Sequence, residues 1–388
     1  MSKSPYRTVE LKRGKQSINR KHPWIFSGAL HNIPRDISEG EKVCVVNESG
    51  EVVVTGHFAK GSIAIRALAF SSVLIDEKFY TEKIQNALSL RESLGLVKSD
   101  STNAYRLMHG EGDGIPGLVV DIYNKIAVLQ SHSAGVSADV PMITQALKNV
   151  IGDDLVDVSL KNVGKDEVKA TPSQVEITEH GHRFAVDYVT GQKTGFFIDQ
   201  RENRKLLGSF AEGKKILNAF SYTGGFSVYA LNGGASEVHS LDSSKSALAT
   251  LDINLDLNGF DDARHTSLAE DALGYLNSDE AKEAEYDIIV LDPPAFAKHR
   301  SARHRAIQAY KRLNARAMNI LKPGSLLFTF SCSQVVTPEL FNHTIAAAAI
   351  DSGKDIRILH HLHQPADHPI SIFHPEGEYL KGLVLQIG

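Results

Sequence analysis

One stretch constrains the fold of this chain more than any other: an apolar run, a pair of glycines and a second apolar run. Ile216 to Phe220 reads as a buried parallel strand, Thr223-Gly224-Gly225 as a turn, and Phe226 to Leu231 as a helix. Vicinal glycines let the main chain approach a bound group closely, and a helix start offers backbone N–H donors to an anionic group. The order predicts a ligand site in an α/β domain, although any strand-to-helix turn favours glycine.

Acidic and polar residues near neighbouring strands narrow the class of ligand. The strand Glu237 to Asp242 ends in an aspartate that is placed to accept hydrogen bonds from a ribose diol, which fits NAD or S-adenosylmethionine. The G-x-G-x-x-G spacing of a dinucleotide site is missing, which argues against a pyrophosphate ligand. Asp271, after a third strand at His265 to Leu268, would accept from an adenine amino group or cap a helix. Asp199 and Gln200 would line the same crevice, with a helix cap as the alternative for Asp199.

Length and composition indicate a soluble protein of two or three domains. The 388 residues exceed one typical core, and the net charge of -4 gives no general reason to expect nucleic acid. No apolar run approaches a membrane span and the N-terminus lacks the core of a signal peptide, so we expect a cytoplasmic protein. Only Cys44 and Cys332 are present, without metal-ligand spacing, and we expect no metal.

The N-terminal part predicts a small β-barrel. Short alternating runs at 42–46, 51–55 and 62–68 are separated by turn residues. The basic segment before them holds Arg20, Lys21 and the only tryptophan, Trp24. Basic side chains beside an aromatic suit phosphate contacts and base stacking, and a solvated face beside a structural tryptophan explains them equally well.

A helix over 77–94 opens a second module. Strands at 118–123, 126–130 and 155–160, a helix near 140–150 and a hairpin across 180–182 continue it as an α+β insert. We find no pattern in this insert that indicates chemistry.

Two strand ends in the last third carry the reactive groups. Asp292 ends the strand that begins at Tyr286, and Pro293-Pro294 would hold a rigid loop there, with Phe296 able to clamp a flat base. Cys332 follows the strand 325–330, and we predict that it, and not Cys44 inside an apolar run, is the reactive thiol.

The segment Lys298 to Lys322 holds eight basic residues and no acid. If it is a helix with its apolar residues inward, Arg305, Arg312 and Arg316 project together as a phosphate-binding surface.

With Thr223-Gly-Gly225, Asp292-Pro-Pro-Ala-Phe296 and Ser331-Cys-Ser333 in view, the sequence resembles the PUA-domain class I rRNA methyltransferases, most closely the bacterial 23S rRNA 5-methylcytosine methyltransferases. The resemblance covers essentially the whole chain, including His22–Gly28 and Tyr379–Gly382. It implies a PUA-like RNA-binding barrel (1–74), a central α+β domain (75–188) and a C-terminal Rossmann-like α/β methyltransferase domain with a seven-stranded sheet (189–388).

The resemblance also implies a cofactor and a partner. S-adenosylmethionine would lie with its methionine part near Asn218 and Thr223 to Gly225, its ribose at Asp242 and its adenine at Asp271. The partner would be RNA, either 23S rRNA or a large-subunit precursor, with no membrane involved. The oligomeric state stays open, a homodimer included.

The implied reaction uses Cys332 as the nucleophile. Its thiolate would add to carbon 6 of a pyrimidine so that carbon 5 can take the methyl group, while Asp292 hydrogen-bonds the ring. A base, which the sequence does not identify, would remove the carbon 5 proton so that Cys332 can leave. Pro293, Pro294 and Phe296 would hold the base.

Three alternatives stay open. No second cysteine follows Asp292, an arrangement shared with RNA 5-methyluridine enzymes, so both cytosine and uracil are possible targets. Asp-Pro-Pro followed by an aromatic is similar to adenine amino-group methyltransferases, and related PUA-type enzymes methylate a guanine ring nitrogen without a cysteine. A non-catalytic RNA-binding module is the third alternative.

Overall fold

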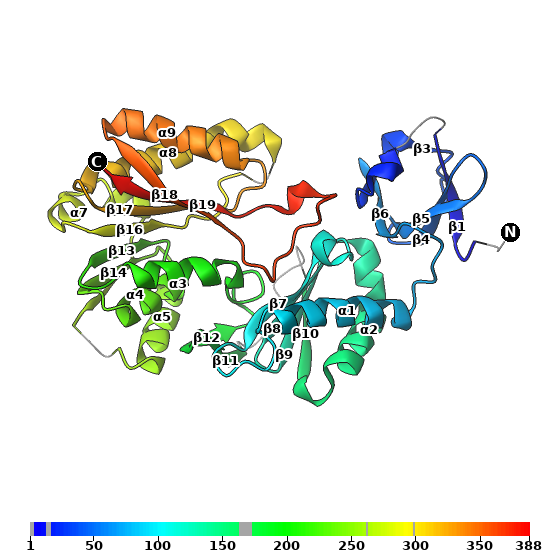
Figure 1. Ribbon diagram of the computed structural model, residues 1–388, viewed down its shortest axis with the longest axis horizontal. Coiled ribbons are helices and arrows are strands. Elements are labelled where there is room, and N and C mark those ends of the chain that lie inside the picture. Colours follow the sequence, from blue (N-terminus) through cyan, green and yellow to red (C-terminus); the bar gives the residue numbers. More distant parts are fainter. Residues whose placement is uncertain (1–3, 13–16, 163–172, 261–262, 298) are drawn as a thin grey trace. The chain divides into compact units, whose positions relative to one another are not determined.

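The computed structural model in Figure 1 describes residues 4–12, 17–162, 173–260, 263–297 and 299–388. The chain forms two compact units and passes between them several times. The first unit comprises Met1–Thr178, Val186–Ile198 and Ala366–Gly377, and the second comprises Glu179–Ala185, Asp199–Pro365 and Glu378–Gly388. Within the described ranges, no helix combines the length and the apolar character needed to cross a membrane.

The first unit begins with a six-stranded sheet in the order β2-β6-β5-β4-β1-β3. Alternate residues of these strands bury an aliphatic core that includes Val43, Val54 and Ile65, as a half-buried sheet requires. The three strands predicted from alternation are confirmed as β4, β5 and β6; the three others are short or adjoin the basic segment, where no alternation marks them. The bounds are β1 (Arg7–Leu11), β2 (Trp24–Phe26), β3 (Leu30–His31), β4 (Lys42–Val46), β5 (Val52–Phe58) and β6 (Ile63–Ala69).

A four-stranded sheet, β10-β9-β8-β7, follows in the first unit, and two helices, α1 (Glu77–Ser93) and α2 (Ala134–Ile151), pack with it around one core. The predicted α+β insert is confirmed. The predicted hairpin is present as a separate two-stranded sheet of β11 (Gln174–Glu179) and β12 (His182–Asp187), but its residues Glu179–Ala185 belong to the second unit. The four strands are β7 (Ala104–His109), β8 (Leu118–Tyr123), β9 (Ile126–Ser131) and β10 (Asp157–Asn162).

Helix α2 starts earlier than the predicted helix near 140–150. Ser133 caps it by accepting from the Val136 backbone N–H. Its early turns contain Asp139, a buried acid whose oxygens contact Tyr80 Oη at 2.6 Å, His57 Nε2 at 2.9 Å and Lys42 Nζ at 2.7 Å. These three partners outweigh the burial and lower the pKa of Asp139. An acid normally indicates a surface position, which is why the sequence pattern missed this turn.

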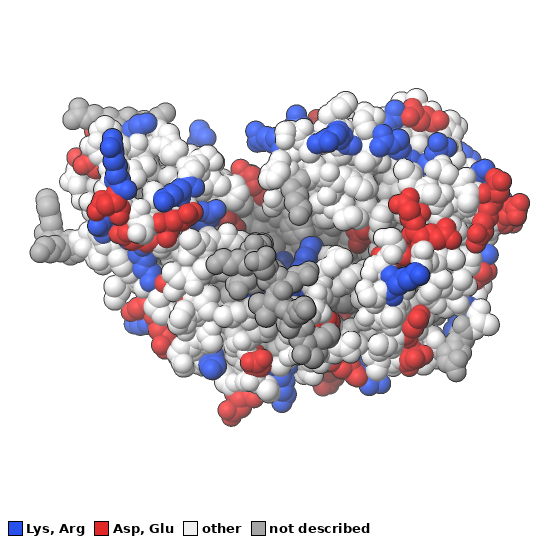
Figure 2. Space-filling view, turned by 180° about the vertical axis from the view of Figure 1, so that it is seen from behind, with Lys and Arg blue, Asp and Glu red and all other residues white. Residues whose placement is uncertain are grey.

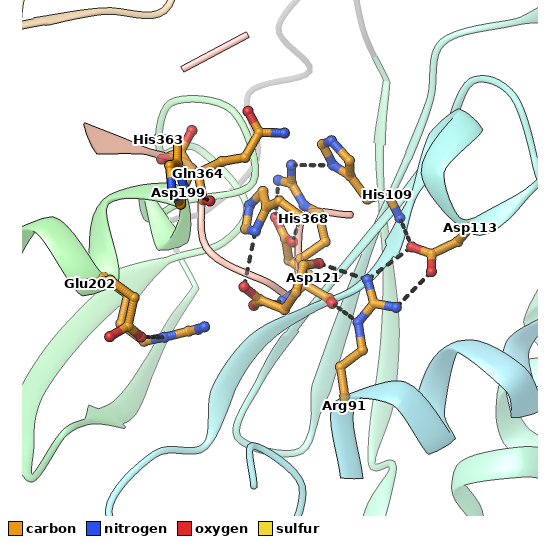
Figure 3. Close-up of polar contacts among 12 residues, drawn as sticks. Arg91, His109, Asp113, Asp121, Asp199, Glu202, His363, Gln364 and His368 are labelled. Atoms are coloured by element: carbon orange, nitrogen blue, oxygen red, sulfur yellow. Dashed lines mark hydrogen bonds and ion pairs between the residues drawn. The ribbon is translucent and has the colours of Figure 1, made fainter. Parts of the chain in front are cut away.

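Hydrogen bonds from two ion-paired arginines of this insert reach Asp367 in the segment Ala366–Gly377, and Figure 3 shows one of the ion pairs, Arg91–Asp113. Arg91 forks onto both oxygens of Asp113 at 2.6 and 2.8 Å and also donates to the Asp367 carbonyl at 2.6 Å. Arg106 pairs with Asp121 at 2.7 and 2.9 Å, and its backbone N–H donates to Asp367 Oδ2. Bidentate pairs fix the geometry of both arginine side chains. The hydrogen bonds from these two residues to Asp367 then hold the segment within the first unit.

The second unit is a seven-stranded sheet in the order β15-β14-β13-β16-β17-β19-β18. Strands β13 to β17 pair in parallel, and β19 pairs antiparallel with both neighbours. The predicted α/β class and the predicted antiparallel final pair are therefore confirmed. The bounds are β13 (Lys215–Ala219), β14 (Glu237–Leu241), β15 (His265–Leu268), β16 (Ile288–Leu291), β17 (Leu326–Ser331), β18 (Ile356–His363) and β19 (Lys381–Ile387).

Helices cover both faces of this sheet (Figure 1). Helices α3 (Arg201–Ser209), α4 (Gly225–Asn232) and α5 (Lys245–Leu257) lie on one face, and α8 (Arg303–Ile320) and α9 (Pro338–Ser352) lie on the other. Two short helices, α6 (Ala272–Tyr275) and α7 (Asp279–Glu283), follow β15. The core between the sheet, α8 and α9 includes Leu291, Leu327, Tyr310 and Phe341. The central parallel strands β13, β16 and β17 are buried on both sides, whereas every residue of the edge strand β15 is at least partly exposed.

Candidate active site

The sheet order places the predicted site at a topological switch point. Strand β13 lies between β14 and β16, and the chain runs from β13 to β14 and β15 before it returns to β16 on the other side. In open α/β sheets, ligands bind outside the carboxyl ends of the strands at such a reversal. The turn after β13 and the loop after β16 therefore lie at the same edge of the sheet, next to this reversal.

The turn after β13 is wound tightly and held by its neighbours. Phe220, Tyr222 and Gly224 all have left-handed backbone angles, with φ of 60°, 48° and 81°. The Tyr222 backbone N–H donates to Asp242 Oδ2 at 2.9 Å, and Asn254 Nδ2 donates to the Thr223 carbonyl at 2.8 Å. The turn is thus preorganised by β14 and α5 rather than left mobile.

Packing accounts for both glycines of this turn. A Cβ atom on Gly224 would lie 2.5 Å from Leu251 Cγ, and one on Gly225 would lie 3.0 Å from Arg204 Cδ. Gly224 also ends the turn in the left-handed region directly before α4. The protein's own packing therefore requires a glycine at 224 and leaves little room for a side chain at 225, whatever ligand their backbone also approaches.

Two buried polar atoms at the same strand end have no hydrogen-bond partner among the described residues. Asn218 is 1% exposed; its Nδ2 donates to Ser227 Oγ at 2.8 Å, but its Oδ1 accepts nothing. Ser221 Oγ is also buried without a partner. Such atoms are rare because each costs free energy. One acceptor and one hydroxyl at the carboxyl end of β13 suit the charged amino-acid end of a small ligand.

The two predicted nucleotide acids already have backbone partners. Asp242 accepts from Tyr222 N–H through Oδ2 and from Ser244 N–H through Oδ1, at 2.9 and 2.8 Å. Each carboxylate oxygen keeps a second lone pair, so a ribose diol can still be accepted. Asp271 is exposed and caps α6 by accepting from Gly274 N–H at 2.8 Å.

Asp199 and Gln200 are buried in a 3-10 turn, η5 (Ile198–Gln200), and both residues belong to the second unit. Asp199 Oδ2 accepts from the Tyr379 hydroxyl at 2.6 Å, and Gln200 Oε1 accepts from Asn203 Nδ2 at 2.6 Å. Both side chains therefore hold neighbouring elements of the protein together.

Asp292 and Cys332 leave the sheet at the same edge. They follow β16 and β17, which pair in parallel with Leu291 opposite Thr329. Burial raises the pKa of the Tyr310 hydroxyl on α8 to about 12, and the negative charges of Cys332 and Asp292 act in the same direction. The thiol and the carboxylate thus both influence this one hydroxyl.

The two loops are also joined to each other. Ser333 Oγ donates to the Ala297 carbonyl at 2.7 Å, and the Phe296 ring packs at 4.6 Å from the Tyr310 ring. Pro293 is buried and Pro294 is exposed, while Asp292 and Cys332 are half-buried. The thiol is therefore partly exposed, next to a loop that contains two prolines.

A buried lysine beside Cys332 was not assigned a role by sequence reasoning. Lys381 is 5% exposed, and its Nζ donates to the carbonyls of Ser333 and Val336, each at 2.6 Å. Burial lowers the pKa of Lys381 to about 8, opposed by the charge of Cys332. In the sequence, Lys381 stands out only as the single charged residue of the strand β19, which it begins.

Arg305, Arg312 and Arg316, called here the α8 arginines, are all exposed, as predicted for one helix face. Figure 2 shows lysine and arginine side chains gathered over the surface that α8 and α9 form. Lys298, at the start of the predicted basic segment, lies outside the described residues.

Trp24, by contrast, is held inside the first unit. Its Nε1 donates to Glu111 Oε1 at 2.7 Å, and its ring packs at 4.4 Å from the His374 ring. Arg20 and Lys21 beside it are exposed. This arrangement matches the structural alternative for the tryptophan and leaves the two basic side chains accessible.

His22, His374 and Glu376 gather next to this tryptophan, with ligand atoms within 4.8 Å of one another. His22 Nδ1 faces the Trp24 backbone N–H at 3.0 Å and must accept from it. The proton of a neutral ring then lies on Nε2, 3.3 Å from Glu376 Oε2, where it forms a hydrogen bond. This tautomer offers His22 no lone pair for a metal ion.

Comparison with known proteins defines the class to which this fold and site belong. A family model for S-adenosylmethionine-dependent methyltransferases matches residues 167–373, and one for a PUA-like domain matches residues 9–70. The chain is a class I S-adenosylmethionine-dependent methyltransferase with an N-terminal PUA-like barrel, and the predicted cofactor is confirmed.

The relatives identify the family more closely. Ribosomal RNA large subunit methyltransferase I of Klebsiella pneumoniae (strain 342) is 36% identical over 401 residues, which cover 100% of both chains. The protein of that name from Escherichia coli (strain SMS-3-5 / SECEC) is 37% identical over 396 residues, covering 98% of this chain and 99% of its own. The chain belongs to this family.

Solved structures agree on the fold. A chain described as a SAM-dependent methyltransferase from Streptococcus mutans superposes with a TM-score of 0.84 at 22% identity, covering 98% of this chain and 100% of its own. Another solved chain, with a TM-score of 0.84 at 23% identity, is a methyltransferase complexed with SAH.

Proposed function

We propose that this protein methylates carbon 5 of a cytosine in 23S rRNA of the large ribosomal subunit, through a covalent adduct with Cys332. The relatives that share its full length are named as large-subunit ribosomal RNA methyltransferases. One observation supports the choice of atom. The half-buried thiol of Cys332 and the carboxylate of Asp292 follow adjacent parallel strands, and both raise the pKa of Tyr310.

The cofactor's chemistry fits the other side of this edge. Bound S-adenosylmethionine supplies an electrophilic methyl group on a sulfonium. Asn218 Oδ1 and Ser221 Oγ, the buried atoms without partners, would receive its amino-acid end, and Asp242 would accept from its ribose. The backbone N–H groups at the start of α4 would face its carboxylate.

The protein's own groups would then act in sequence on the pyrimidine. Cys332 loses its proton and its thiolate adds to carbon 6, which places electron density on carbon 5. Asp292 hydrogen-bonds the ring edge and stabilises the charge that develops during this addition. After methyl transfer, loss of the carbon 5 proton to a base allows the carbon 6–sulfur bond to break and restores the thiolate.

The test combines product analysis with a cysteine pair. Naked 23S rRNA and intact large subunits are incubated with labelled cofactor, and the labelled nucleoside is identified after digestion. We expect 5-methylcytidine from the wild type and from Cys44→Ser, whose buried thiol lies in the barrel, and none from Cys332→Ser. Cys332→Ser should still bind the cofactor; full methyl transfer by this variant would exclude the covalent route.

A second target base is favoured by one observation. The loop from Pro293 to Ala297 contains no second cysteine, an arrangement that resembles 5-methyluridine enzymes. Labelled 5-methyluridine in the digest would support uracil while keeping the adduct. RNA containing 5-fluorocytosine or 5-fluorouracil separates the two pyrimidine targets from purine methylation, because only addition of Cys332 to the matching base would trap a stable covalent complex.

A further inference from the structure

Lys381 occupies a position that an apolar residue would fill at lower cost. It starts β19, in which five of the six following residues are buried, and its own side chain is almost fully enclosed. Taking an ammonium out of water costs several kcal/mol unless a counter-charge compensates. Among the described residues, no carboxylate lies within ion-pair distance of Lys381. A compensating group must be sought elsewhere.

The contacts of this amine all converge on the reactive loop. In the antiparallel pairing of β17 and β19, Lys381 is opposite Ser331, the residue before Cys332. Its Nζ bonds to the carbonyls of Ser333 and Val336, the two ends of the turn after Cys332, which is closed by a Val336 N–H to Ser333 carbonyl bond. The ammonium therefore fixes the segment that carries the thiol.

The charges that face Lys381 support the same assignment. Cys332 and, to a smaller extent, Glu378 oppose the lowering of its pKa by burial. A cation beside a cysteine favours the thiolate, which is the nucleophilic form. With a pKa of about 8, the amine is still mainly protonated at pH 7.

We propose that Lys381 is a positioning residue for Cys332: its ammonium fixes the turn that follows the cysteine and stabilises the thiolate. This inference rests on the proposed function. Lys381 keeps its proton throughout; the proton of the thiol leaves to solvent or to another base, and no bond to Lys381 forms or breaks.

The test measures the thiol directly, without RNA. In a Cys44→Ser background Cys332 is the only thiol, and its rate of alkylation by iodoacetamide is followed from pH 5 to 10. We expect Lys381→Met to move the midpoint upward by about one pH unit and to slow alkylation at pH 7 about tenfold, since one unit is a tenfold change in thiolate. Lys381→Arg keeps the charge and should keep the midpoint. An unchanged midpoint in Lys381→Met overturns the proposal.

Two further variants separate charge from loop structure. Lys381→Gln keeps N–H donors and loses the charge, so its midpoint should shift as in Lys381→Met although the turn can still form; if Lys381→Met fails to fold, this variant decides. Lys354→Met is the matched control, because Lys354 Nζ donates to the Leu321 carbonyl at 3.3 Å in the same unit and should leave the midpoint unchanged.

Methyl transfer distinguishes the two proposals. We expect single-turnover transfer to fall at least tenfold in Lys381→Gln with cofactor affinity unchanged. If Cys332→Ser retains transfer, the proposed function fails whatever the alkylation profile shows. If Cys332→Ser is inactive but Lys381→Gln transfers at the wild-type rate, only the positioning role of Lys381 is refuted.

Discussion

Replacing Gly224 with alanine tests whether the turn after β13 is set by packing. Gly224 has φ of 81° and its added Cβ would lie 2.5 Å from Leu251 Cγ. The left-handed conformation costs alanine roughly 1–2 kcal/mol, and overpacking adds about 1–3 kcal/mol. Alanine returns about 0.4–1 kcal/mol by restricting the unfolded chain. We therefore expect a net loss of stability of about 1–4.5 kcal/mol.

Gly259→Ala provides the matched control. Gly259 has φ of 75°, and a Cβ there would meet no atom within 4 Å. It should show the conformational cost alone, about 0–1.5 kcal/mol. Urea denaturation of both variants gives the two free energies of unfolding, and calorimetric titration with S-adenosylmethionine should show at least tenfold weaker binding for Gly224→Ala only.

A double-mutant cycle with Leu251→Ala isolates the steric part. Leu251 is fully buried, so its truncation alone should cost about 2–5 kcal/mol. In that background Gly224→Ala no longer meets the leucine branch, and the cycle should give a favourable coupling of about 1–3 kcal/mol. Zero coupling, or equal losses for the two glycine variants, would refute the packing argument.

Three further outcomes follow from the same physical reasoning. Glu179→Gln should cost about 3–5 kcal/mol in a denaturation assay, because it leaves Arg204 buried without the carboxylate that it contacts at 2.7 and 2.8 Å; the exposed Glu176→Gln on the same strand should change stability by less than about 0.5 kcal/mol. Replacing the α8 arginines with glutamine should reduce the slope of log binding constant against log salt by about 2–3 if each contacts one RNA phosphate, and an unchanged slope would remove α8 from the interface. Burial lowers the pKa of Lys381 from its ordinary 10.5 to about 8, so between these pH values the unfolded chain holds a proton that the folded protein has released. The stability of the wild type relative to Lys381→Gln should therefore rise with pH in this window. A fall would contradict the direction of the pKa shift.

The sequence predicted the elements whose pattern follows directly from burial. The apolar runs of β13 and β16 mark strands buried on both faces, and Asp242 and Asp292, which follow β14 and β16, mark the carboxyl edge of the sheet. The sequence did not predict the positions at which a charged side chain is buried among partners from distant segments. Asp139 and Lys381 look like surface residues until tertiary contacts supply their hydrogen bonds. Local periodicity contains no information about such partners.

The polar residues near these strand ends fall into two groups, according to whether other groups of the protein already complete their hydrogen bonds. Gln200 and Asp271 each accept a hydrogen bond from another residue of the protein, so these two side chains have a structural role that needs no ligand. Asn218 and Ser221 instead hold buried atoms with no partner in the described chain. A buried polar atom is tolerated when a bound molecule completes its bonds. We therefore infer that the affinity for the cofactor depends more on Asn218, at the end of β13, than on Asp271, the acid that the sequence suggested for the adenine. Asn218→Leu should weaken cofactor binding more than Asp271→Ala does, and the reverse order in a titration would contradict this ranking.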